Sequence, residues 1–173
     1  MLDNMQGITM ANQARRLRQR LERSRGFSAR LLEDFSTAEE WTRQLHDGGN
    51  HAAWFVGHMG TTDNFMISIL DPDRAEEREG YSRSFGMGSE PSAEIKDYPP
   101  VEELLSFMVS RREVLLEILD GLDEEALERE TPEGTPGFMP DYASVFETAI
   151  WHEALHSGQL SMIRRALGHA PIV

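Results

Sequence analysis

The amino-acid sequence predicts an all-α protein, folded as an up-down four-helix bundle. Four long stretches place apolar residues three or four positions apart, which is the period of an amphipathic helix. Segments rich in glycine and proline separate these stretches, and no stretch alternates apolar and polar residues as a half-buried strand does. The chain has 173 residues, enough for one well-buried domain and few for two, so residues 1–173 are expected to form a single domain.

The first helix is expected over about residues 11–32, where leucines mark the apolar face. The basic run RRLRQRLERSR, residues 15–25, lies within it and is interpreted as a solvated helix face. Ser36 and Glu39 follow with the spacing of a capping box, in which each residue satisfies a free backbone N–H at a helix start. This spacing predicts a short second helix after the first long one.

The next long helix is expected over residues 51–70. The turn sequence HDGGN precedes it, with Asn50 as the expected cap, and Pro72 prevents the helix from continuing. A stripe of residues three and four apart shares one face of this helix: Phe55, His58, Thr62, Phe65 and Ile69. His58 therefore lies on the apolar stripe.

Residues 71–100 are rich in Gly, Ser, Pro and Glu, and a loop of this length in a compact domain is usually functional or disordered. Tyr81, Phe85 and Met87 are its apolar members. They indicate that the loop either packs over a site or simply docks on the bundle surface.

Two further long helices complete the expected bundle. One starts near Pro100 and closes at Gly121, since proline is favoured in a first helical turn and glycine at a helix end. An irregular stretch follows at residues 131–140. The last helix is expected over residues 142–167, with Gly168 as its stop.

Composition and charge exclude several classes of function. The chain has no cysteine, so any metal must be held by nitrogen and oxygen, and any thiol chemistry must bring its thiol from outside. The net charge of −13 repels phosphate backbones and disfavours nucleic-acid binding. Polar residues interrupt the apolar residues 52–70, so no membrane-spanning helix is expected. The first twenty residues lack an apolar signal core, and a cytoplasmic location is expected.

Three histidines are candidate metal ligands. His152 and His156 are four residues apart on the last helix, so both can reach one ion, and His58 lies on the inward stripe of another helix. Each alone could be an ordinary core histidine. Three unpaired buried imidazoles would carry a large desolvation cost, which favours a shared metal. His46 and His51, like His169, fall in or beside loops and are interpreted as surface residues.

Residues 152–156 also spell H-E-x-x-H, the motif of zinc proteases. The protease interpretation lacks a third ligand, because Met162 stands six residues past the motif and no acidic residue follows Glu153. Glu153 is also rotated about 100° from His152 on a helix of 3.6 residues per turn. We expect it to face solvent or a partner.

Three blocks of the chain resemble the DinB-like superfamily, also named after its YfiT-like members. These blocks are NHAAWFVGHMGTTDNFM, the run YSRSFGMGSEP with YPPVEELLSFM, and WHEALHSGQLSMIRRALG, and the similarity extends over nearly the whole chain. The resemblance implies a four-helix bundle with a divalent metal held by three histidines. Transferred to this sequence, these ligands are His58, His152 and His156.

The resemblance also implies an activity and an assembly. Members with known activity are thiol-dependent enzymes, including transferases that use bacillithiol, mycothiol or glutathione, and a mycothiol-dependent maleylpyruvate isomerase. Family members often form homodimers. By this resemblance the chain is expected to act on a small-molecule substrate, to form a homodimer, and to bind neither nucleic acid nor membrane.

Several hypotheses about the site remain open at this point. Three imidazoles leave a coordination position open and suit zinc, nickel or iron(II), so a thiol activated there could attack an electrophile under residues 71–100. Gln159 could orient ligand or water, or make a helix–helix hydrogen bond. Arg112 could pair with a cofactor carboxylate, or lie on the surface. The alternatives are a metal-dependent hydrolase and a non-catalytic metal-binding stress-response protein.

Overall fold

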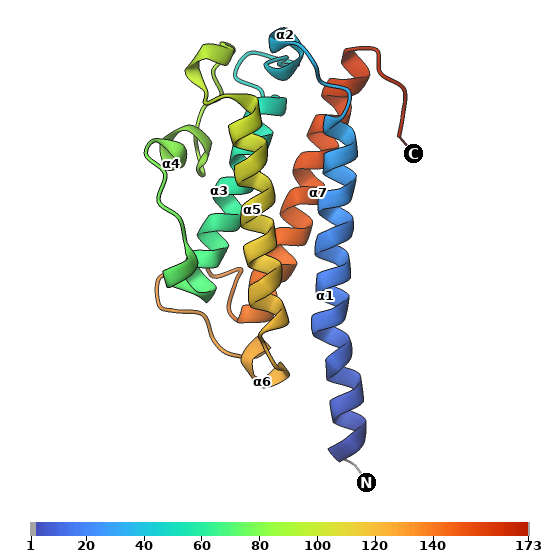
Figure 1. Ribbon diagram of the computed structural model, residues 1–173, viewed down its shortest axis with the longest axis vertical. Coiled ribbons are helices and arrows are strands. Elements are labelled where there is room, and N and C mark those ends of the chain that lie inside the picture. The colour runs from blue at the N-terminus through green and yellow to red at the C-terminus, as the bar shows by residue number, and fades with distance from the viewer. Residues whose placement is uncertain (1–2, 173) are drawn as a thin grey trace.

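The computed structural model describes the backbone of residues 3–172 and the side chains of residues 13–172. Four long helices lie side by side in it (Figure 1): α1 (Asp3–Leu32), α3 (Ala52–Leu70), α5 (Val101–Asp120) and α7 (Tyr142–Ala166). The short helices are α2 (Ala38–Trp41), α4 (Tyr81–Phe85) and α6 (Glu124–Leu127), with 3₁₀ turns η1 (Pro72–Arg74) and η2 (Ile95–Asp97). The described residues contain no strand, which confirms the all-helical fold.

Helix direction departs from simple alternation at one connection. On α3 and α5, Asp63 pairs with Arg112 and Gly60 lies against Met108, so positions rise together along both helices and the two run parallel. The colours of Figure 1 show the same, since both helices run from the top of the view to the bottom. The long segment 71–100 allows this, because it carries the chain back along the bundle before α5 begins.

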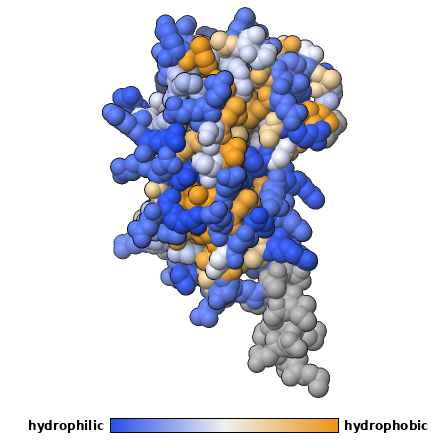
Figure 2. Space-filling model, viewed as in Figure 1, coloured by the Kyte–Doolittle hydropathy of each residue, from blue (hydrophilic) through white to orange (hydrophobic). Residues whose placement is uncertain are grey.

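Apolar side chains make up most of the core, where they form two clusters along the bundle. α3 packs against both α5 and α7, and α1 packs mainly against α7. Gly60 permits the close approach of α5, because a Cβ there would lie 2.7 Å from the Phe107 ring. Hydrophilic side chains cover most of the face seen in Figure 2, with apolar side chains visible in patches between them, and the buried residues are mainly apolar. No helix among the described residues has both the length and the apolar character to cross a membrane.

The helix starts differ by one residue from the sequence prediction in two places. α2 is capped by Thr37 with Glu40, not by Ser36 with Glu39, and the Thr37 hydroxyl accepts from the Glu40 N–H at 3.2 Å. The prediction was wrong because neighbouring residues offer the same chemistry and only the extended backbone at Thr37 selects the cap.

α3 is capped by His51, not by Asn50. The His51 backbone is extended, and its ring Nδ1 accepts the N–H of Trp54 at 3.2 Å. Asn50 instead donates its amide to Gln159 of α7 at 3.0 Å. An imidazole is an uncommon cap, so residue preference alone favoured Asn50.

Residues 71–100 pack against the bundle through α4. Tyr81 and Phe85 are buried, and Phe85 fits against Gly57, where a Cβ would lie 2.4 Å from its ring. Met87 is 87% exposed and takes no part. Phe65 of α3, expected on the inward stripe, is 45% exposed, and it lines an open cavity between α3 and segment 76–82.

Candidate metal centre

His58 is held in one orientation by α3 and α4. Its Nδ1 donates to the carbonyl oxygen of Phe85 at 2.6 Å, and its ring stacks on Trp54 with centroids 4.3 Å apart. Donation from Nδ1 leaves the lone pair on Nε2. This side chain is buried, and its Nε2 points toward α7.

The two histidines of α7 meet it there. His152 Nε2 lies 3.1 Å from His58 Nε2 and 3.2 Å from His156 Nε2. One ligand atom from each of the three lies within 4.8 Å of the others. The helix bundle thus brings together residues that are 94 positions apart in sequence.

Gln159 fixes the third histidine. Its Oε1 lies 2.8 Å from His156 Nδ1 and also accepts from Asn50 at 3.0 Å, so it links α7 to the loop before α3. Since an amide oxygen only accepts, His156 donates from Nδ1 and carries its lone pair on Nε2.

The three nitrogens have too few protons to satisfy one another. Nε2 of His58 and Nε2 of His156 both present lone pairs, and His152 can supply one proton at most. Protonation of the cluster is disfavoured. Burial lowers the pKa of His58 to about 4. The pKa of His152 is lowered to about 3, mainly by burial and further by the positive charges that His156 and His58 would carry.

This donor set suits a divalent metal ion. Two imidazole nitrogens bound about 2.1 Å from one ion lie roughly 3.0–3.4 Å apart at angles between tetrahedral and octahedral values, and the observed spacings of 3.1 and 3.2 Å fall in that range. Metal-binding histidines commonly donate their second N–H to a carbonyl or another acceptor, as His58 and His156 do here. The cluster could therefore hold one ion.

Glu153 turns away from the histidines into the bundle interior. It is fully buried, not solvent-facing, and its carboxylate pairs with Arg25 at 2.7 Å and with Arg112 at 2.9 Å. Ser28 donates to it at 2.5 Å. A carboxylate held by two cations is not available as a general base, which separates this site from a zinc protease.

Arg112 is buried and not a surface residue. It holds Asp63 through two hydrogen bonds of 2.9 Å, and Arg25 bonds the same carboxylate at 3.0 Å. Burial alone would lower the pKa of Arg112, but Asp63 and Glu153 raise it. The four residues form a buried tetrad that joins all four long helices.

Sequence reasoning missed this tetrad, although a signal was present. Arg112 continues the apolar stripe of its helix, and a charge on a buried stripe needs an opposite charge facing it. Arg25 was assigned to a solvated face, yet its side chain is only 12% exposed.

The remaining histidines do not join the cluster. His46 is exposed and His169 is half-buried. His51 is fully buried, so its assignment to the surface was wrong: its ring caps α3 and also contacts the Ser92 carbonyl at 2.8 Å.

Comparison with known proteins identifies one family. The sequence profile of the DinB superfamily matches residues 20–160, a span that contains all three clustered histidines. No curated protein matches the chain.

Proposed function

The chain belongs to the DinB superfamily, and from this premise we propose that it binds one divalent metal ion through His58, His152 and His156 and transfers a small thiol to an electrophile. The observation that supports the metal best is the meeting of three Nε2 atoms with only one proton available among them. Zinc, nickel and iron(II) all suit such ligands.

An external thiol fits the composition of the chain. With no cysteine, the protein has no thiol of its own to serve as a nucleophile. A divalent ion in this centre would favour the deprotonated form of a thiol or water beside it. His152 and His156 are only half-buried, which leaves the centre open to a small molecule on one side.

The chain's own residues would position both ligands and substrate. Trp54 and the Phe85 carbonyl fix His58, and Asn50 and Gln159 fix His156. The Gln159 amide nitrogen has no hydrogen-bond partner among the described residues, so it can donate to a bound molecule at the rim of the site.

Hydrolysis is less well supported. A metal-assisted hydrolase generally needs a nearby group to accept a proton from water. The carboxylate next to the cluster in sequence, Glu153, is buried in ion pairs with Arg25 and Arg112. A thiol with a pKa near 8–9 loses its proton more readily than water does, so its activation depends less on a nearby base.

The test compares three reactions of the metal-loaded protein. Glutathione, bacillithiol and mycothiol are each incubated with the electrophile 1-chloro-2,4-dinitrobenzene, and thiol loss is followed. We expect loss with at least one thiol, and none with His152→Ala. Hydrolysis of 4-nitrophenyl acetate without thiol would favour the hydrolase. Absence of both reactions in a metal-loaded protein would favour a non-catalytic metal-binding protein.

A further inference from the structure

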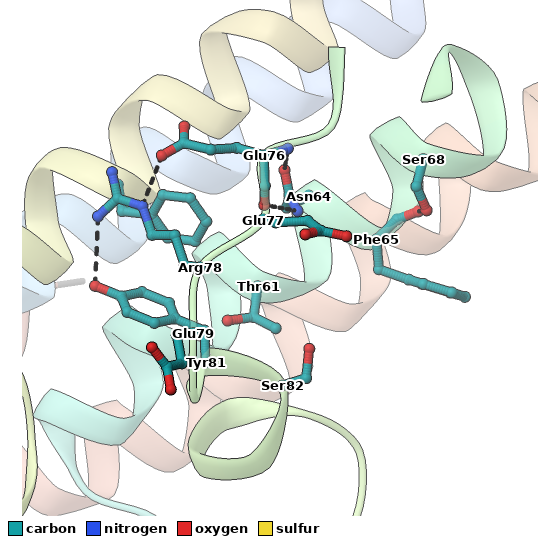
Figure 3. Close-up of a pocket in the computed structure, with 11 residues that line it drawn as sticks. Thr61, Asn64, Phe65, Ser68, Glu76, Glu77, Arg78, Glu79, Tyr81 and Ser82 are labelled. Atoms are coloured by element: carbon teal, nitrogen blue, oxygen red, sulfur yellow. Dashed lines mark hydrogen bonds and ion pairs between the residues drawn. The ribbon is translucent and has the colours of Figure 1, made fainter. Parts of the chain in front are cut away.

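A second cavity lies beside α3, apart from the histidines. It has a volume of about 700 Å³, is open to solvent on one side, and is bordered by one face of α3, segment 76–82 and Phe107 of α5. None of the three clustered histidines lines it. Figure 3 shows Thr61 on its floor, with Phe65 on one side and Tyr81 on the other. A cavity of this size accommodates a small organic molecule.

Its walls are fixed by hydrogen bonds. The Asn64 amide donates to the Glu76 carbonyl at 2.8 Å and accepts the Glu76 N–H at 2.9 Å, which ties the segment to α3. Arg78 lies 4.4 Å above the Phe107 ring and pairs with Glu76 at 2.7 Å and Glu103 at 3.3 Å. The cavity is therefore a built feature of the fold and does not depend on a loose loop.

The charged groups that remain free in this cavity are acceptors. Its amide and guanidinium donors are used internally, because Asn64 bonds the segment and Arg78 bonds Glu76 and Glu103. The Thr61 hydroxyl oxygen is buried with no partner among the described groups. Glu77 and Glu79 are exposed, and neither carboxylate makes an ion pair within the described part of the chain.

Charge points to the same kind of ligand. The lining contains three glutamates, residues 76, 77 and 79, against the single cation Arg78, and the whole chain carries −13. An anion would be repelled. Among the described residues, the acidic groups here do not gather closely enough to hold a metal ion, unlike the histidines. The free acceptors therefore favour an ammonium group, which offers three donors and no acceptor.

We propose that this cavity binds a small organic cation, with its ammonium group attracted by the exposed carboxylates of Glu77 and Glu79 and an apolar body against Phe65. The exposed Phe65 ring then has a role, since it supplies an apolar wall beside the charged groups. This site does not depend on the metal centre, and it requires no metal ion.

Isothermal titration in phosphate buffer of low ionic strength tests the proposal, with 2-phenylethylammonium as the probe. Phenylacetate, with a similar body and the opposite charge, is the matched ligand control. We expect the ammonium to bind the metal-free and the metal-loaded protein equally, and phenylacetate to bind neither. Glu77→Gln and Glu79→Gln should each weaken binding about fivefold. Glu90→Gln, an exposed glutamate of the same connecting segment outside the cavity, should change nothing.

A cavity-filling variant gives an independent check. Ser82 is exposed on α4 at the cavity wall, so Ser82→Trp should fill the space and abolish binding while the circular dichroism spectrum stays that of the parent. The proposal is overturned if the parent does not bind the ammonium, if phenylacetate binds as well, or if Glu77→Gln, Glu79→Gln and Ser82→Trp all bind as the parent does.

Discussion

His51 shows how one side chain can couple helix capping to pH. Its Nδ1 must stay unprotonated to accept the Trp54 N–H, while its Nε2–H donates to the Ser92 carbonyl. Burial lowers the pKa of His51 below its ordinary value of 6.5. In the unfolded chain this histidine takes up a proton near pH 6.5, whereas the folded protein resists it.

Neutral His51 makes the stability of the folded protein depend on pH. Because the unfolded state binds more protons below about pH 6.5, the stability contributed by neutral His51 is complete above that pH and is lost as pH falls. Urea unfolding of metal-free protein at several pH values should show this. His51→Asn keeps a capping side chain but does not titrate, so its stability should fall less steeply between pH 6.5 and 5. An identical slope for both proteins would contradict this role.

Single residues were predicted from the sequence with mixed success. The period of the apolar residues placed His58, His152 and His156 on inward faces, because a helix turns every 3.6 residues. The spacing of residues along a helix shows which side of the helix a side chain occupies, but it does not show which residues of other helices that side chain contacts. Glu153 was rotated away from the site as expected, yet its partners Arg25 and Arg112 come from other helices and could not be deduced from its own.

Among the helices, α3 and α4 depend on a close contact at Gly57. A Cβ at this position would lie 2.4 Å from the Phe85 ring, and Phe85 is fully buried. Gly57→Ala should therefore destabilise the protein by about 1–3 kcal/mol and also weaken metal binding, since the Phe85 carbonyl orients His58. Chemical denaturation measures the first effect. Gly26→Ala is the matched control: Gly26 lies inside α1, a Cβ there would meet nothing within 4 Å, and the change should stabilise the protein by up to about 1 kcal/mol.

The buried tetrad should dominate the electrostatic contribution to packing between helices. Arg112→Met leaves Asp63 and Glu153 buried with one cation between them, and should cost about 3–5 kcal/mol of unfolding free energy. Arg18→Met removes an exposed pair with Asp120 and should cost about 1 kcal/mol or less. Urea unfolding measures both losses. Equal losses of unfolding free energy in the two variants would show that the buried ion pairs stabilise the protein no more than the exposed pair does.

The ends of the helices were predicted from the sequence more accurately than the direction in which each helix runs. Pro72, Gly121 and Gly168 stop their helices by backbone chemistry that acts locally, so the ends were expected within a residue or two. The direction of α5 was not predicted. Segment 71–100 is long enough either to carry the chain back along the bundle, which makes α5 parallel to α3, or to turn directly into an antiparallel helix. In the structure this segment packs Phe85 against Gly57 of α3, and a contact between distant segments leaves no local signal in the sequence.

For the whole molecule, we propose a homodimer formed through the outer face of α7. Trp151, Leu155 and Met162 share that face, and each is at least half exposed, at 50%, 56% and 62%. Light scattering at micromolar concentration should give twice the mass of one chain. Leu155→Glu should reduce it to one chain, while Val109→Glu, on α5 and 47% exposed, should not. A monomer for the parent would contradict the proposal.

The metal centre is the central claim, and metal content tests it most directly. Protein purified without chelator is analysed for metals by mass spectrometry, together with His58→Ala, His152→Ala and the exposed control His46→Ala. We expect about one divalent ion per chain for the parent and for His46→Ala, and loss of most of it in both other variants, because two imidazoles make a much poorer site than three. A parent without metal, or His58→Ala that retains metal as the parent does, would contradict the three-histidine centre.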